Sequence, residues 1–161
     1  MAILPVQVEG KSKQSAQMIV ALRGTSIGEL REMDFGGEGD DALALCFDLD
    51  IIDLKTGRKM GTASDCLSNI VETSEGFALV GRSIFNFPGG TLVTRGLTSV
   101  QPTTHGSPDF THITGDIPEA DENSVLVATG RFKNAIGPDR LSGSVKMMPI
   151  GPEQLQITLD C

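Results

Sequence analysis

The ten residues 128–137, ATGRFKNAIG, restrict the fold of this chain more than any other segment. They follow residues 124–127, SVLV, whose branched aliphatic side chains favour a strand. Gly130 and Gly137 allow backbone angles that other residues avoid, so the strand is expected to end in a tight corner. Phe132, between them, has the size to plug a barrel or the edge of a sheet. The segment therefore predicts β-structure that turns around one buried ring.

The rest of the chain has the pattern of strands more than of helices. Apolar side chains recur at every second position of residues 43–51: Leu43, Leu45, Phe47, Leu49 and Ile51. This period of two places them on one face of a strand, with Asp48 and Asp50 on the solvated outer face. Further strands are expected at residues 18–22, 61–71, 77–87, 91–100, 124–129, 141–147 and 155–159. A short helix or turn is expected only at residues 26–33, where Ser26 has the position of a cap.

Three segments occur in an order known from one family of barrels. Residues 57–62, GRKMGT, are followed by Cys66; residues 85–90, FNFPGG, precede a Thr-Arg-Gly triplet; and residues 128–137 come last. Together they resemble the two glycine corners and the central hairpin of the allene oxide cyclase and dirigent superfamily, over roughly residues 42–148. The resemblance implies an all-β fold, an eight-stranded antiparallel closed β-barrel. Eight strands is also the number at which a closed barrel can hold one small ligand.

The length of 161 residues suits a single domain with a sizeable core. Residues 101–122 form a long connection rich in Pro, Thr, Gly and Asp, with one strand-like piece at residues 110–114. Compared with the family pattern, this connection resembles an insertion. Long connections in compact domains are usually functional lids or disordered linkers. We therefore expect residues 101–122 to form a lid over the barrel mouth.

Charge and cysteine content limit the partners that the chain is expected to have. Its net charge is −8, from 13 basic and 21 acidic residues, and the basic residues do not cluster, so nucleic acid and anionic membranes are poor partners. No apolar stretch has the length of a transmembrane span, and the first residues lack the pattern of a signal peptide. Cys46, Cys66 and Cys161 have no metal-ligand spacing and are expected to be reduced thiols in a cytoplasmic protein. Related barrels form trimers, so the resemblance implies a homo-oligomer.

Both histidines lie in the expected lid. His105 and His112 have Asp109 and Asp116 nearby in the sequence. Because histidine titrates near neutral pH, our hypothesis is that His105 and His112 are catalytic acid/base groups that reach the barrel mouth. The alternative is that both are solvated loop residues. Two histidines and two aspartates at this spacing match no recognised metal site, and no metal is expected.

The family resemblance also predicts which side chains face the cavity. In allene oxide cyclases the cysteine of the strand after the glycine corner faces inward, and Cys66 has the matching position. The corresponding inward positions elsewhere are expected at Val80, Arg82, Ile84, Asn86, Leu92, Thr94, Gly96, Thr98, Phe47 and Leu49. Of these, Arg82 is the predicted catalytic residue. The predicted substrate contacts are Asn86, Cys66, Phe47, Leu49, Thr94 and Thr98.

The register of these strands decides the role of Arg82. Inside an apolar barrel its guanidinium must find a carboxylate or bind an anionic or oxygen-rich ligand. If the register differs by one residue, Arg82 lies outside in water and Asn86 becomes a turn residue before Pro88. Cys66 is either a small buried hydrophobe or a nucleophile.

The reactive groups of the family do not carry over residue by residue. Residues 18–22 contain no acidic residue where allene oxide cyclases place one, and Ile136 stands where plant dirigent proteins carry arginine. A closed apolar barrel with a few polar groups can still orient a ligand without a cofactor, because positioning and desolvation contribute much of a rate. The sequence therefore predicts a cofactor-independent isomerase/cyclase or lyase acting on a small, partly apolar oxygenated molecule. The alternative is a non-catalytic ligand-binding or stereo-directing barrel.

Overall fold

The computed structural model describes residues 2–7, 15–36, 43–102, 110–115, 124–137, 139–152 and 154–161. In this part of the chain the regular structure is all β, apart from one 3₁₀ turn, η1, at Gly130–Phe132. The strands are β1 (Ala2–Gln7), β2 (Ser15–Val20), β3 (Leu22–Asp34), β4 (Leu43–Asp53), β5 (Lys59–Thr73), β6 (Gly76–Phe87), β7 (Gly90–Gln101), β8 (Phe110–Gly115), β9 (Val125–Ala128), β10 (Arg140–Gly151) and β11 (Gln154–Asp160). Within these residues no helix is long and apolar enough to cross a membrane.

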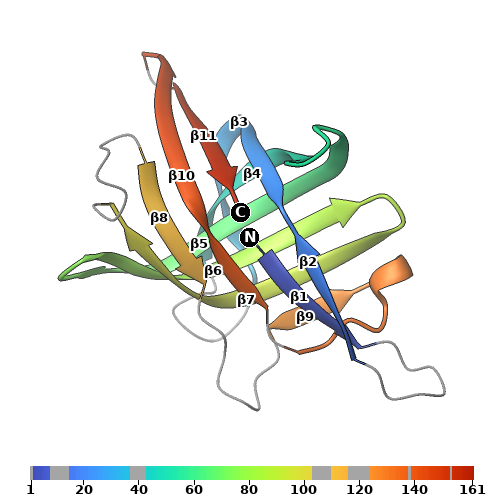
Figure 1. Ribbon diagram of the computed structural model, residues 1–161. Coiled ribbons are helices and arrows are strands. Elements are labelled where there is room, and N and C mark those ends of the chain that lie inside the picture. The colour runs from blue at the N-terminus through green and yellow to red at the C-terminus, as the bar shows by residue number, and fades with distance from the viewer. Residues whose placement is uncertain are drawn as a thin grey trace.

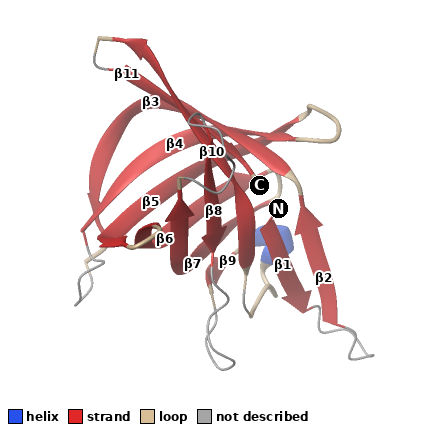
Figure 2. Ribbon diagram, turned by 60° about the vertical axis from the view of Figure 1, so that its left-hand side comes forward, coloured by secondary structure: helices blue, strands red, loops and turns tan. Residues whose placement is uncertain are grey.

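Eight of these strands close into an antiparallel barrel (Figure 1). Their order is β11-β3-β4-β5-β6-β7-β8-β10, and β10 pairs back with β11 to complete the wall. The remaining strands extend this wall: β9 pairs with β7, and β1 and β2 form a hairpin beside β10 (Figure 2). Closure gives every wall strand a partner on both sides, which removes the exposed edges of an open sheet. The predicted eight-stranded closed barrel is confirmed.

One end of the barrel is plugged. Here β4 and β6 end and β5 and β7 begin, and the buried ring of Phe132 packs among inward-facing residues of the wall, with its centroid 5.8 Å from that of Phe87. Leu92, fully buried, and Ala135 complete this cluster. A second cluster, formed by residues that include Leu49, Ile51 and Ile157, fills the adjoining part of the interior. Both clusters leave the opposite half of the barrel open for a cavity.

Residues 26–33 belong to strand β3, so the expected short helix or turn is wrong. Ser26 does not cap a helix; its hydroxyl accepts a hydrogen bond from the Ile157 backbone N–H at 2.8 Å. Gly28, with a φ of 72°, lies where the register between β3 and β4 shifts between Ile27 and Arg31. Pairing with β4 outweighs the weak local helix signal.

The segment expected to be a lid contributes one strand to the wall. Phe110–Gly115 is β8, which pairs with β7 on one side and β10 on the other. Residues 103–109 and 116–123 lie outside the described residues. A lid formed by these two stretches stays a prediction.

The corner that holds the plug depends on Gly130. Its φ is 59°, and a methyl group there would overlap the carbonyl oxygen of Gly89. Gly57 has a similar φ of 69° but open space around it. We therefore expect Gly130→Ala to lower the free energy of unfolding by about 3 kcal/mol, because backbone strain and overlap add, and Gly57→Ala to lower it by about 1 kcal/mol through strain alone. Urea denaturation of both variants measures the difference, and equal losses would show that the corner is not tightly packed.

Candidate functional site

The open half of the barrel encloses a cavity of about 360 Å³. Its wall is mostly aliphatic, and two phenyl rings, those of Phe47 and Phe77, add to it. The mouth lies where β4 and β6 begin and β5 and β7 end. Its rim carries exposed apolar side chains that also line the cavity: Leu30, Leu45, Ile70, Phe77, Leu97 and Leu155. A pocket of this size and polarity suits a small, largely apolar molecule.

Polar side chains form one row across the inner wall. Asp65 on β5 pairs with Ser83 on β6, and Ser83 pairs with Thr94 on β7. Directly paired residues of antiparallel strands project from the same face, and all three line the cavity. Asp139, just before β10, also lines the cavity, and the Thr94 hydroxyl stabilises its charged form. The row therefore has a carboxyl group at each end.

Asp65 is the more strongly perturbed carboxyl group. Burial raises its pKa from 3.8 to about 6, because the apolar wall disfavours the charged form. The Ser83 hydroxyl, which donates to Oδ1 at 2.8 Å, and the backbone N–H of Cys66 partly oppose this rise in pKa. No Lys, Arg or His among the described residues lines the cavity, so no neighbouring cation holds Asp65 ionised.

Asp139 has a raised pKa for the same main reason, burial. The hydroxyls of Ser124 and Thr94 oppose the rise by stabilising the carboxylate. Ser124 is buried, and its Oγ makes no hydrogen bond of ordinary geometry with the described residues, so its contact with Asp139 is a weak one. Two carboxyl groups with raised pKa values in one apolar cavity are typical of acid–base chemistry.

Six of the residues predicted to face inward do so, among them Gly96, which lines the cavity, and Leu92, which is buried in the plug cluster. Phe47, Thr94 and Thr98 line the cavity. Leu49 lies on the same face of β4 and is fully buried in the core cluster below. Their roles as substrate contacts stay predictions.

The expected orientation of β5 and β6 is wrong by one residue. Phe47 pairs with Asp65, which pairs with Ser83, and these three residues face the cavity. Because side chains alternate along a strand, Cys66 and Arg82 project from the outer face. The family's cysteine therefore gives the wrong anchor for this chain.

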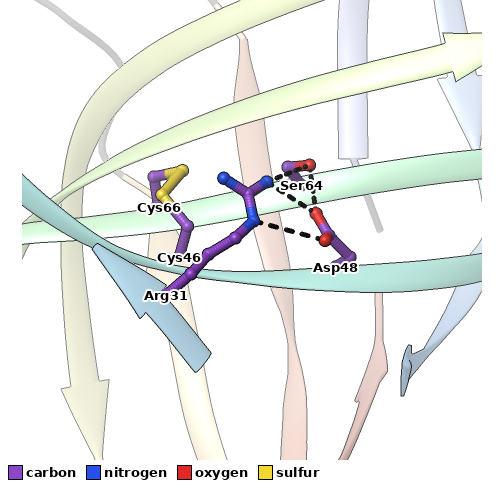
Figure 3. Close-up of polar contacts among 5 residues, drawn as sticks. All are labelled: Arg31, Cys46, Asp48, Ser64 and Cys66. Carbon is purple, nitrogen blue, oxygen red and sulfur yellow. Dashed lines mark hydrogen bonds and ion pairs between the residues drawn. A yellow bond between two sulfur atoms is a disulfide. The ribbon is translucent and has the colours of Figure 1, made fainter. Parts of the chain in front are cut away.

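Cys66 forms a disulfide with Cys46, its direct partner on β4 (Figure 3). The expectation that all three cysteines are reduced is therefore wrong, as is an inward-facing Cys66 thiol. Cys161 is the free cysteine; burial, more than the nearby charges of Asp65 and Asp160, raises the pKa of its thiol to about 12. The disulfide also removes the basis on which a cytoplasmic location was expected.

A charged cluster lies beside this disulfide (Figure 3). The Arg31 guanidinium donates to both carboxylate oxygens of Asp48, at 2.9 and 3.3 Å, and Ser64 Oγ donates to the same carboxylate. Arg31 and Ser64 hold the pKa of the Asp48 carboxyl group below its usual value. This cluster connects β3, β4 and β5 on the solvated side of the wall. Its charges compensate each other, so we assign it a structural role.

The other polar residues predicted for the cavity also lie elsewhere. The Arg82 guanidinium carbon is 4.0 Å from the centre of the Phe35 ring, on the outer face. Asn86 is exposed beside the turn between β6 and β7, where its Oδ1 accepts a hydrogen bond from Thr91 Oγ1 at 3.2 Å. The predictions of a catalytic Arg82 and of a cavity-lining Asn86 are therefore wrong. The reason is the one-residue difference in register.

Of the two histidines, His112 lies within the described residues. His112 lies on β8 between Thr111 and Ile113, which line the cavity, so its side chain projects from the opposite face. Its Nε2 is 3.1 Å from Thr114 Oγ1. A catalytic His112 in the cavity is therefore wrong, because the segment that carries it is a wall strand. His105 lies outside the described residues, and its role stays a prediction.

Sequence reasoning missed Asp65, Ser83 and Asp139. Asp65 lies between Ala63 and Leu67 on the inward-facing side of β5. A carboxyl group is costly at this position unless it has a role. That signal was present, but the incorrect register placed Asp65 in solvent. The described residues contain no group of three or more His, Cys, Asp or Glu side chains that would hold a metal ion.

Comparisons with known proteins give limited information. No protein-family profile matches the chain, and no curated protein does. Among solved structures, it is similar to a pyocyanin demethylase with a TM-score of 0.39 and 13% identity, over 86% of this chain and 95% of that one. It is also similar to a nonspecific heme-binding cyclase that catalyses a cycloaddition during neoabyssomicin biosynthesis, with a TM-score of 0.39 and 20% identity, over 87% of this chain and 60% of that one. Neither likeness is close enough to support a functional assignment.

The disulfide gives a direct chemical prediction. Denatured without reductant, the protein should expose one reactive thiol, that of Cys161, and reduction should expose those of Cys46 and Cys66 as well. The bridged cysteines are 20 residues apart, so reduction should lower the free energy of unfolding by about 3 kcal/mol through the greater freedom of the unfolded chain. Thiol titration and urea denaturation with and without reductant measure both effects. Three reactive thiols before reduction would contradict the prediction.

Proposed function

We propose that this barrel is a cofactor-independent isomerase/cyclase or lyase that uses Asp65 as its general base. The observation that carries the proposal is a carboxyl group with a pKa of about 6 inside an apolar cavity whose described lining has no cation. A base is most effective when its pKa lies near the working pH. Asp65 is mostly ionised at neutral pH, yet it binds a proton far more readily than an exposed aspartate.

The proposed substrate is a small, partly apolar molecule with a carbonyl group. Asp65 removes a proton from a carbon beside that group: the C–H bond breaks, its electron pair enters the enolate, and an O–H bond forms on Asp65. Return of the proton to a different carbon gives an isomer. In a lyase, the electron pair instead expels a leaving group, which takes a proton from Asp139.

The rest of the row supports this chemistry. The hydroxyl of Ser83 donates to Asp65 and fixes the orientation of its carboxylate. Thr94 and Thr98 lie on the next strand, where their hydroxyls can hydrogen-bond to the enolate oxygen. The apolar wall excludes water, which strengthens these interactions.

A non-catalytic ligand-binding barrel remains the competing proposal, and the following experiment separates the two. Small apolar ketones and enones are incubated with the protein in D₂O, and deuterium incorporation beside the carbonyl group is followed by NMR. Asp65→Asn should lower the exchange rate by about a hundredfold or more, because the amide cannot accept the proton. Asp50→Asn, a change on the outer face where Asp50 pairs with Lys59, should have little effect. If no carbonyl compound exchanges faster with the protein than in buffer alone, the result would favour the binding barrel.

The pH dependence gives an independent prediction. Because the pKa of Asp65 is raised in the folded state, its contribution to stability is present below pH 3.8 and is lost as the pH rises through about 6. Asp65→Asn should therefore be more stable than the wild type by about 1 to 3 kcal/mol at pH 8, with a difference near zero at pH 3. Urea denaturation at both pH values tests this. In wild-type protein, proton exchange should fall as the pH drops through about 6.

Assembly into a homotrimer, which the family resemblance implies, also stays a proposal. Light scattering at micromolar concentration tests it. A monomer would remove the trimer without affecting the assignment of Asp65.

A further inference from the structure

The negative charge of Asp65 in the cavity is compensated by no cation of the described wall. Asp65 and Asp139 both line the cavity, and no described lining residue is Lys, Arg or His. The contacts of Asp65 are the hydroxyl of Ser83 and the backbone N–H of Cys66, which are neutral donors. A buried carboxylate without a cation is costly, so a ligand that supplies the cation gains that energy on binding.

We propose that the cavity selects small, largely apolar molecules that carry a positively charged nitrogen, held against Asp65, and that it rejects carboxylates. This inference concerns the site of the proposed function and names its substrate class, but its test does not depend on turnover. It differs from the anionic or oxygen-rich ligand that an inward-facing Arg82 could have bound.

The shape of the cavity fits such a ligand. The polar row contributes Asp65 on one strand, and the aliphatic wall extends from there to the apolar rim at Leu45 and Leu97. The nitrogen would lie at the row, with the apolar body pointing toward the mouth. The ring of Phe47, whose strand position is paired with Asp65, is also a favourable neighbour for a cation.

The cavity disfavours the binding of an anionic ligand. Its carboxylate would lose water and approach two carboxyl groups, with no guanidinium or ammonium on the described lining to receive it. The net charge of −8 adds to the repulsion. In the proposed reaction, a cationic nitrogen near the carbonyl group would add an inductive effect to the acidity of the neighbouring C–H.

Few titratable groups face Asp65. On neighbouring strands it faces the neutral hydroxyls of Ser83 and Thr94. Across the interior are Asp139 and, after β11, the Cys161 thiol, whose pKa of about 12 keeps it neutral. Arg31, Arg82 and His112 project from the outer face of the barrel. Protonation of Asp65 should therefore remove most of the preference for a cation.

The test compares three ligands with the same alkyl chain: hexylammonium, 1-hexanol and hexanoate. Titrations followed by NMR at pH 8 and 150 mM salt should show hexylammonium binding on the order of tenfold tighter than hexanol, with hexanoate weakest. At pH 4.5 the advantage of hexylammonium over hexanol should largely disappear. Hexanoate binding as tightly as hexylammonium, or no binding of hexylammonium, would overturn the proposal.

Two variants locate the effect. Asp65→Asn should reduce hexylammonium affinity to the level of hexanol and leave hexanol affinity within about twofold, because only the ion pair is lost. Asp50→Asn changes the net charge equally on the outer face and should preserve the selectivity. An equal loss in both variants would assign the preference to general surface charge and overturn the proposal. If Asp65→Asn abolishes the selectivity but leaves deuterium exchange unchanged, the proposed base fails while the cation site stands.

Discussion

The register between strands β4, β5, β6 and β7 decides what this barrel has inside. Phe47, Asp65, Ser83 and Thr94 are paired in sequence from strand to strand, so their side chains form one row on the inner wall. A shift of one residue in β5 and β6 would replace this row with Cys66 and Arg82 and turn both Asp65 and Ser83 to solvent. The cavity would then be cationic, and it would select a different class of ligand. The chemistry therefore follows from strand pairing more than from any local motif.

The plug makes this chemistry effective. Gly130 permits the corner, and the corner places Phe132 across one end of the barrel, where it packs against Phe87. The plug fills this end of the barrel, and the described rim of the mouth at the other end is apolar. The low polarity of this surrounding raises the pKa of Asp65, and the same surrounding strengthens its interaction with any cation that enters. The acid–base proposal and the cation proposal thus depend on one physical cause.

The sequence contained enough to predict the barrel but not its interior. Glycine corners and period-two alternation are local signals, and both Phe132 and the β4 face with Phe47 and Leu49 were placed correctly. The prediction of a helix or turn at residues 26–33 failed because the pairing of this segment with β4 is not visible locally. The Cys66 anchor failed because a resemblance between motifs does not fix register to one residue. Asp65 was missed as a consequence, since its role depends entirely on which face it occupies.

The disulfide fixes the register of β4 against β5 in the folded chain. It joins Cys46 to Cys66, which are adjacent to Phe47 and Asp65, the pair that faces the cavity. A covalent bond between directly opposed residues excludes any other register of β4 against β5, and the backbone N–H of Cys66 stabilises the Asp65 carboxylate. Arg31 and Asp48 add an ion pair on the same outer face. The outer face of β4 and β5 thus carries the bonds that hold Asp65 in place, while the inner face carries the reactive group, and this division follows directly from the alternation of side chains along a strand.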